Sequence, residues 1–348
     1  MQVVIKDMCS VSRWIRMWLC LVVTVILILG CSDNSSDVLN IVFFGNGQLL
    51  QHVSTLQFPS AMRLCTDGDY VYLLDESRGL VIIDVSNPGR PQEVSSMLIG
   101  GSDPQNIVVS GSYAYLVNGD SLLVISVANP RSPSRIGGLL TPCWARGLAK
   151  SGNYVYVADG CGMIVVSVSN PTNPIIVATA EDPGFPNPSS MAVEGNYAYM
   201  GLTISGSMRG GIRVYSVSNP SAPVFMSVND DPYSVTGIAV QNNMAYLTGS
   251  HGLEVVNLLN PTNTISEYDF DNIIDYSYAV TLYRNWAFVA AGMTLEIVDV
   301  HNPASPEISM SYRDYSATSN YMDICSSQDY IFIADGNRGL QIFRFVSE

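Results

Sequence analysis

Apolar and polar residues alternate along most of this chain in short runs that suit β-strands, and these runs repeat seven times. Each copy has an aromatic-X-aromatic run, a short acidic or glycine-rich turn and an aliphatic run, and six copies add an Asn-Pro pair. The first runs begin at Tyr70, Tyr113, Tyr154, Tyr197, Met244, Trp286 and Tyr330. Spacings of 41 to 47 residues with a few strands per copy are typical of β-propeller blades. We therefore predict an all-β, seven-bladed β-propeller with four antiparallel strands in each blade.

The second copy illustrates how four strands arise in one blade. Residues 105–110, 113–117 and 122–127 are β-rich runs between turn residues, and a weaker fourth strand follows Asn129-Pro130. Asparagine favours turns and proline fixes φ, so each Asn-Pro pair predicts the connection between the third and fourth strands. On the first strand an aliphatic residue precedes a mostly small one in the seven copies, as expected for the strand nearest the axis.

The seventh copy ends at Glu348 before a fourth strand can form. The segment Leu50–Leu56 aligns with 91–97, the fourth strand expected between the first two copies. We predict that this N-terminal strand completes the last blade and closes the ring, because closure removes an open sheet edge.

The first thirty residues have the composition of an export signal. Lys6, Arg13 and Arg16 precede the apolar stretch 17–29, which is too short to span about 30 Å of hydrocarbon as a helix. Cys31 follows Ile28-Leu29-Gly30 and resembles the lipidated cysteine of a bacterial lipobox. We predict a lipoprotein signal peptide at 1–30, the lipidated Cys31 and a tether at 31–49, and the propeller at 50–348.

Charge narrows the range of partners. The full chain has a net charge of −14, and loss of residues 1–30 leaves 13 basic against 29 acidic residues, or −16. Nucleic acids require clustered Lys and Arg, so we expect no nucleic-acid binding. Anionic lipid would repel the same surface, so we expect membrane contact only through the lipid anchor, and a monomer.

The repeat itself resembles a known family. Residues 79–88 read Gly-Leu-Val-Ile-Ile-Asp-Val-Ser-Asn-Pro, and these ten residues and their relatives in the other copies resemble LVIVP repeats over 50–348. Departures are Asn257-Leu258-Leu259 in the fifth copy, His301 in the sixth and the missing Asn-Pro in the last. The resemblance implies a propeller exposed on a bacterial or archaeal cell surface, often as a lipoprotein, and it brings no catalytic residue set.

The copies differ most in the connections between blades, which share a rim with the second-to-third turns. These loops concentrate acidic and tyrosine side chains, which suit a basic protein segment, a glycan or a cation. The plain alternative is that any surface loop carries such residues. We predict that a protein or glycan partner binds through Asp230, Asp231, Tyr233, Asp269, Asp271, Asp275, Tyr276, Tyr278, Asp314 and Tyr315.

Residues 269–275 place oxygen-bearing side chains at alternating positions, as calcium loops do. An EF-hand would need glycine at its sixth place and glutamate at its twelfth, where Ile274 and Val280 stand. We therefore assign no cofactor or metal, and a calcium site shared with other loops stays an open alternative.

Two smaller sets of residues have structural interpretations. Asp75, Asn118, Asp159 and Asp335 stand five residues after their copies begin, where we expect them to cap turns rather than to form a carboxylate ring. Cys143 and Cys161 fall in a connection and a turn on the same rim, so they are the candidate disulfide, while Cys65 and Cys325 are expected as small buried residues.

Catalysis finds no support in the sequence. His52, His251 and His301 fall on an outer strand, a rim turn and an opposite-rim connection, so they cannot readily converge on a metal or a nucleophile. We expect no enzyme but a lipid-anchored binding module of the cell envelope, at the outer membrane or cell surface. The alternatives are a polysaccharide hydrolase or lyase that uses rim carboxylates, and a purely structural surface module.

Overall fold

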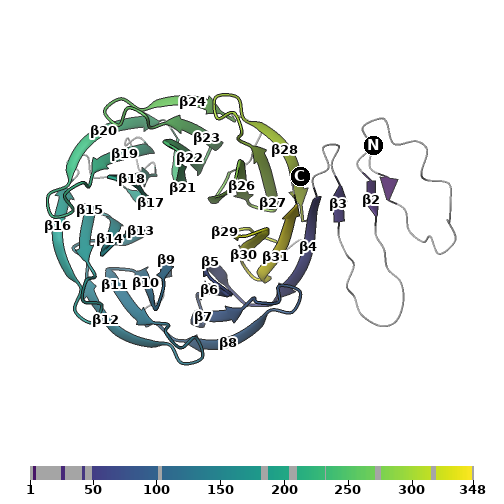
Figure 1. The fold of residues 1–348 in the computed structure, drawn as a ribbon, viewed down its shortest axis with the longest axis horizontal. Helices are drawn as coiled ribbons and strands as arrows, with labels where there is room; N and C mark the ends of the chain where they lie inside the picture. The colour runs from purple at the N-terminus through teal and green to yellow at the C-terminus, as the bar shows by residue number, and fades with distance from the viewer. Residues whose placement is uncertain are drawn as a thin grey trace.

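A computed structural model describes residues 3–4, 25–27, 41–43, 49–100, 104–181, 187–203, 210–231, 233–270, 276–314 and 319–346. Side chains are described from residue 49 onward, except at 181, 230, 231 and 269. Seven antiparallel sheets of four strands stand in a ring around a central axis (Figure 1). The seven-bladed propeller predicted from the repeat is confirmed.

Each blade runs from an inner first strand to an outer fourth strand. Blades 1 and 2 comprise β5 (Ala61–Asp67), β6 (Tyr70–Asp75), β7 (Gly79–Asp84), β8 (Gln92–Met97), β9 (Pro104–Ser110), β10 (Tyr113–Asn118), β11 (Ser121–Ser126) and β12 (Ser134–Leu140). Blades 3 and 4 comprise β13 (Ala145–Ser151), β14 (Tyr154–Asp159), β15 (Gly162–Ser167), β16 (Ile175–Glu181), β17 (Pro188–Glu194), β18 (Tyr197–Leu202), β19 (Gly210–Ser216) and β20 (Val224–Asp231).

The remaining blades follow the same order. Blades 5 and 6 comprise β21 (Val235–Gln241), β22 (Met244–Gly249), β23 (Gly252–Asn257), β24 (Ile265–Asp269), β25 (Ala279–Tyr283), β26 (Trp286–Ala291), β27 (Thr294–Asp299) and β28 (Glu307–Arg313). Blade 7 comprises β29 (Asp323–Ser327), β30 (Tyr330–Asp335), β31 (Gly339–Val346) and β4 (Leu49–Leu56).

The N-terminal strand β4 closes the ring, as predicted. It pairs antiparallel with β31, from Leu340 opposite Leu56 to Val346 opposite Leu49, and the two lie side by side in Figure 1. The short strands β3 (Ile41–Phe43), β2 (Val25–Leu27) and β1 (Val3–Val4) extend this sheet into the segment that the sequence assigns to tether and signal peptide. No helix among the described residues is long and apolar enough to cross a membrane.

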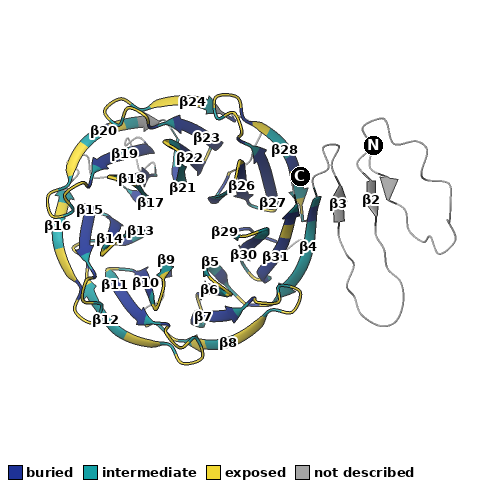
Figure 2. Cartoon of the chain, viewed as in Figure 1, coloured by how far each residue is buried: buried dark blue, intermediate teal, exposed yellow. Residues whose placement is uncertain are grey.

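The hydrophobic core is divided into seven clusters, one between each pair of neighbouring blades. Alternation along the second strand explains this division, because successive side chains point to opposite faces. In blade 1, Val71 packs toward blade 7 and Tyr72 toward blade 2. The other aromatic runs repeat this arrangement. The second strand of each copy is buried on both faces and packs against both neighbouring blades (Figure 2).

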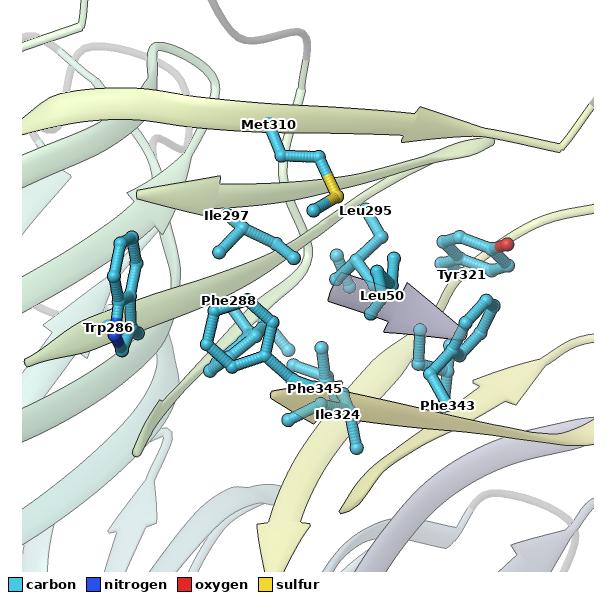
Figure 3. Packing of buried hydrophobic residues seen from close by; sticks show 14 residues of the cluster. Leu50, Trp286, Phe288, Leu295, Ile297, Met310, Tyr321, Ile324, Phe343 and Phe345 are labelled. Carbon is cyan, nitrogen blue, oxygen red and sulfur yellow. The ribbon is translucent and has the colours of Figure 1, made fainter. Parts of the chain in front are cut away.

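The seam between blades 6 and 7 shows how closure is stabilised. Leu50 of β4 is 1% exposed and packs in one cluster with Phe288, Phe343 and Phe345 (Figure 3). The rings of Phe288 and Phe345 meet edge to face, with centroids 5.1 Å apart. Full burial of one leucine contributes about 1.5–3 kcal/mol, so the N-terminal strand adds core packing as well as backbone hydrogen bonds.

Candidate functional site

The connections between blades and the second-to-third turns form one face of the ring, which we call the upper rim. Several described connections hydrogen-bond to the neighbouring second-to-third turns. Between blades 2 and 3, the Ala145 amide donates to the Gly119 carbonyl (2.9 Å), and the Gly160 amide donates back to the Trp144 carbonyl (3.0 Å). The upper rim is therefore a hydrogen-bonded frame whose loops can hold side chains in fixed places.

Buried aspartates organise this frame in blades 1, 3 and 7. The Asp75 carboxylate is fully buried and accepts hydrogen bonds from the amides of Ser60, Ser77 and Arg78, each at 3.0 Å. The Asp159 carboxylate accepts from the amides of Cys143 in its connection and Cys161 in its turn, and the Asp335 carboxylate accepts from the Asn320 amide of its connection. These contacts agree with turn capping and do not bring the carboxylates together, so the structure offers no carboxylate ring among them.

The disulfide candidate lies on the same frame. Cys143 and Cys161 are bonded to each other, with Cα atoms 5.7 Å apart, and both amides donate to Asp159. They stand where Ser60 and Ser77 stand in blade 1. Metal coordination at these sulfurs and Asp159 would require free thiolates. Among the cysteines that the structure describes, Cys65 and Cys325 are free, and burial raises the pKa of both thiols.

Two positions divide the blades into groups. The turn position ends the second strand, and the third-strand position lies two residues deeper on the same face, because Leu73, two residues before Asp75, pairs with Val81. In blades 1 to 7 the turn position holds Asp75, Asn118, Asp159, Leu202, Gly249, Ala291 and Asp335. In the same order the third-strand position holds Val81, Leu123, Ile164, Arg213, Glu254, Glu296 and Gln341.

The polar group stands at the turn position in blades 1–3, as aspartate or asparagine, and at the third-strand position in blades 5–6, as glutamate. Blade 7 carries a polar residue at both positions, and there the Gln341 amide lies 3.2 Å from the Asp335 carboxylate. A long side chain at the third-strand position therefore reaches the place of the turn carboxylate. By this geometry Glu254 in blade 5 points toward the space above Gly249, where blades 1, 3 and 7 have an aspartate.

A small cavity of about 20 Å³ lies at this place in blade 5. Glu254 and residues of the connection and the turn line the cavity. The lining residues are Tyr233, Ser234, Val235, Leu247, Thr248, Gly249, His251, Gly252 and Glu254. The volume suits a water molecule or one small polar group. A Cβ on Gly249 would lie 1.6 Å from the Ser234 carbonyl oxygen, so the aspartate of blades 1, 3 and 7 could not stand here.

The cavity combines buried polar groups with aromatic rings. Thr248 and Glu254 are only 1% and 9% exposed. The Thr248 Oγ1 has no hydrogen-bond partner among the residues that the structure describes, so it can donate to or accept from a bound group. The rings of Tyr233 and His251 stack at the cavity, with 23° between their planes.

A tyrosine pair from the next connection lies beside the blade 5 turn. The Ser277 amide donates to the Gly249 carbonyl (2.9 Å), which brings Tyr276 and Tyr278 to the edge of the blade 5 turn. Their rings meet at 5.1 Å, and Tyr276 remains 45% exposed. Burial, and then the neighbouring Tyr278, raise the pKa of Tyr276, so its hydroxyl stays a donor at neutral pH.

Of the remaining predicted rim residues, Asp314 lies beside blade 7 and the others lie outside the described side chains. Asp314 forms an ion pair with Arg338, which also lies 3.7 Å from Asp335, so blade 7 uses this carboxylate internally. The structure gives no account of the other predicted residues, because the side chains of Asp230, Asp231 and Asp269 and all of Asp271, Asp275 and Tyr315 lie outside the described residues. Neither does it address the calcium alternative at residues 269–275.

The sequence analysis missed three residues of this face. Thr248 and Glu254 line the cavity, and Trp144, which is 50% exposed, projects from the connection into blade 3. The signal for Glu254 was present, since an acidic residue interrupts an aliphatic run that is uninterrupted in the first three copies. Trp144 carried no such signal, because no repeat position corresponds to it.

Solved structures confirm the architecture alone. The propeller domain of Myceliophteria thermophila Cps50 (Swd1) is 10% identical with a TM-score of 0.67, over 85% of this chain and 99% of that one. Kuenenia stuttgartiensis hydrazine synthase (12% identity, TM-score 0.66, 84% and 97% covered) and a streptogramin B lyase (11%, 0.66, 86% and 98%) are similarly related. At these identities the fold is shared and nothing follows about activity. No curated protein sequence matches the chain.

A repeat model matches the chain itself. The LVIVD repeat is found at residues 60–98, 101–141, 144–182, 187–231, 276–314 and 320–343, which together cover about two thirds of the sequence. The unmatched segment between the fourth and fifth matches, 232–275, contains blade 5 and its cavity. The fifth copy was also the one whose Asn257-Leu258-Leu259 departed from the pattern. Because its repeats span most of the propeller, this chain belongs to the LVIVD repeat family.

Proposed function

We propose that this chain is a binding module of the cell envelope, anchored through a lipid on Cys31, which holds a protein or glycan partner on the upper rim over blades 5 and 6. One observation carries the proposal. The blade 5 cavity joins a buried carboxylate, Glu254, and the unsatisfied hydroxyl of Thr248 to the stacked rings of Tyr233 and His251.

The chemistry of the cavity favours a partner that presents a hydrogen-bond donor. A buried carboxylate in a chain of net charge −14 attracts a cationic side chain of a partner and repels an anionic one. The neighbouring Tyr276 and Tyr278 offer aromatic faces to the stem of a lysine or arginine, or to the apolar face of a sugar. A basic protein segment fits both features, and a glycan satisfies the hydroxyl and ring contacts.

Rim variants test the proposed face. In a pull-down from envelope extracts followed by calorimetry with the captured partner, His251→Ala and Glu254→Gln should each weaken binding about tenfold, which corresponds to 1.4 kcal/mol. His301→Ala is the matched control, because His301 is an exposed histidine in a third-to-fourth connection on the opposite face. If capture survives all rim changes, the predicted face is wrong.

The alternative to a binding module is an enzyme, and one activity assay distinguishes the two. The hydrolase or lyase alternative depends on Asp231 and Asp269, whose side chains lie outside the described residues. Cleavage of envelope polysaccharide that disappears with Asp269→Asn or Asp231→Asn would replace the binding module with a glycan-cleaving enzyme.

The anchor has its own test. Metabolic labelling with a radioactive fatty acid should mark the full chain and leave the Cys31→Ala variant unlabelled, with that variant shifted from the membrane fraction to the soluble one. Label on the Cys31→Ala protein would show that the lipid is attached at another residue, which does not affect the argument for the rim.

A further inference from the structure

The first strands of blades 1 to 5 share a β-bulge close to the upper rim. In each of them one residue is skipped in the pairing with the second strand. Bulges of this kind re-aim a side chain and are common beside functional sites. Blades 6 and 7 have an equivalent position just before their first pair with the second strand. From blade 1 to blade 7 these seven positions, which we call the bulge ring, hold Met62, Gln105, Arg146, Ser189, Thr236, Tyr278 and Met322.

The bulge ring surrounds the central axis at the upper-rim end of the first strands. These strands stand closest to the axis in Figure 1, and the seven residues are all half-buried. The Thr236 hydroxyl of blade 5 donates to the Ser277 carbonyl of the next connection (2.6 Å). The Ser189 hydroxyl of blade 4 donates to the Val235 carbonyl of blade 5 in the same way. A side chain of the bulge ring therefore points along the inner edge toward the next blade.

Arg146 of blade 3 cannot end where Ser189 and Thr236 end. A hydroxyl on Cβ just reaches the carbonyl of the next blade, whereas the arginine side chain is long enough to place its guanidinium beyond that carbonyl. Arg146 has no hydrogen bond, ion pair or ring contact with any residue that the structure describes. Its five N–H donors are therefore available to a ligand.

Arg63, one position after the bulge of blade 1, shows how this propeller satisfies an arginine near the axis. Its Nε donates to the Gln105 carbonyl of blade 2 (2.9 Å). Its Nη1 donates to the Met322 carbonyl of blade 7 (3.1 Å). Arg63 thus holds three blades together, and Arg146 makes no such contact among the described residues.

Charge at this end of the axis is balanced except at Arg146. The bulge ring contains no other charged residue. The next position along each first strand holds Arg63, Asn106, Gly147, Ser190, Gly237, Ala279 and Asp323. Arg63 and Asp323 stand in neighbouring blades and attract each other. The two sets of seven positions therefore carry one unbalanced positive charge, in a chain whose net charge is −14.

The connection that leads to Arg146 is held in place on both sides. The Thr141 amide donates to the Asp120 carbonyl of the blade 2 turn (2.8 Å). The disulfide of Cys143 ties the connection to the blade 3 turn. A braced segment loses little conformational freedom when a ligand binds, and this favours affinity. The same connection exposes half of the Trp144 side chain, two residues before Arg146.

We propose that Arg146 binds the carboxylate group of a small ligand at the axial end of blade 3, a site separate from the blade 5 cavity. The planar guanidinium matches a carboxylate through two parallel hydrogen bonds. One unbalanced positive charge matches one carboxylate, whereas a phosphate dianion would add a second negative charge to an acidic chain. The carboxylate can belong to a free organic acid or to an acidic sugar, whose apolar face suits the Trp144 indole. The site does not depend on the partner proposed for blades 5 and 6.

Arginine modification of the full chain tests the site. Phenylglyoxal reacts with accessible guanidinium groups, and peptide mapping by mass spectrometry follows each arginine separately. We expect Arg146 to react faster than Arg63, whose donors are used by backbone carbonyls. With a dissociation constant of about 5 mM, about 50 mM sodium glucuronate should slow the reaction at Arg146 about tenfold. The reference contains glucose and sodium chloride at the same concentration, and the exposed Arg131 is the control that should react equally in both.

Acetate and a tryptophan variant distinguish the two sources of the carboxylate. Equal protection of Arg146 by acetate and glucuronate would support the site with any small organic acid as its ligand. Stronger protection by glucuronate, reduced to the level of acetate in Trp144→Ala, would support the site with an acidic sugar as its ligand.

Four outcomes would overturn the proposal. Arg146 that reacts as slowly as Arg63 would show that its donors are already occupied. Absence of protection by both carboxylates would show that no such ligand binds there, and stronger protection by inorganic phosphate would assign the site to another class of anion. In calorimetry, Arg146→Lys keeps the charge and loses the planar fork, so it should weaken glucuronate binding. Unchanged binding by this variant, with an unchanged thermal unfolding midpoint, would exclude Arg146 as the binding group.

Discussion

Blades 1–3 and blades 4–6 solve the same structural problem with different residues. In the first group the turn position holds Asp75, Asn118 and Asp159, and the third-strand position is aliphatic. In the second group the turn position holds Leu202, Gly249 and Ala291, and the third-strand position is charged. Blade 7 has a polar residue at both, and the two side chains touch.

The comparison shows that a blade can have its polar side chain either at the turn position or at the third-strand position. A carboxylate at the turn is consumed by backbone amides, as the three amides on Asp75 demonstrate. A carboxylate that rises from the third strand leaves the turn free to adopt its own conformation. In blade 5 this freedom coincides with a cavity, so blade 5 has room for a bound group at the place where blade 1 has Asp75 and its hydrogen bonds.

The largest effect is expected from placing an acid in the first group. Val81 is fully buried in the seam between blades 7 and 1, so Val81→Glu would bury a carboxylate without a built partner and should lower the free energy of unfolding by about 4–5 kcal/mol. Urea unfolding measures the change. A loss below about 1 kcal/mol would mean that any blade accepts the acid, and the division into two groups would fail.

The reciprocal change sharpens the same comparison. Glu254→Val gives blade 5 the aliphatic residue of blade 1 and removes the cost of keeping a carboxylate away from water. We expect stability to remain within about 1 kcal/mol of the starting protein while partner binding is lost. A strongly destabilised variant would instead identify Glu254 as a structural group.

Removal of the turn carboxylate should come next in size. Asp75→Ala leaves the amides of Ser60, Ser77 and Arg78 without this acceptor, and buried unsatisfied donors cost about 1–3 kcal/mol each, partly offset by water. We expect a loss of about 3–4 kcal/mol in urea unfolding. Asp75→Asn keeps an acceptor oxygen and is the control, which should lose markedly less.

The sequence predicted the repeated part of the molecule well for a physical reason. Seam residues such as Val71 and Tyr72 have one role in every copy, so seven aligned copies reveal their alternation and the closing strand at Leu50–Leu56. Glu254 has a role in one copy, and its meaning depends on Gly249 across the hairpin and on the Ser234 backbone of another loop. Gly249 and the Ser234 backbone come together only when the connection folds over the turn, and the pattern of a single strand does not reveal this contact.

The disulfide allows blades 1 and 3 to be compared. Blade 3 has two bonded cysteines at the positions where blade 1 has Ser60 and Ser77. Cys161→Ser opens a loop with a sequence separation of 18, and we expect a loss of about 2–3 kcal/mol under non-reducing conditions. Conversely, Ser60→Cys combined with Ser77→Cys should form a new disulfide in blade 1. Peptide mapping by mass spectrometry checks both, and a free Cys143 in the unmodified protein would refute the pairing.

The smallest effect concerns blade 7, where both polar positions are filled and the closing strand contributes His52. Its Nε2 lies 2.9 Å from the Gln341 side-chain oxygen, and burial lowers the pKa of His52 below its usual 6.5. The folded protein therefore takes up this proton less readily than the unfolded chain. The resulting stability is present above pH 6.5 and is lost as the pH falls through the lower pKa of the folded state.

A His52→Gln variant should consequently lose less stability between pH 7.5 and pH 5.5 than the unmodified protein, with a difference of about 1 kcal/mol or less. Thermal unfolding at the two pH values measures it, and His301→Gln, at an exposed site, is the control. Equal pH dependence in all three proteins would mean that protonated His52 keeps its place beside Gln341. Blade 7 would then accommodate a charge beside its third-strand residue, as blades 4–6 accommodate a charge at that position.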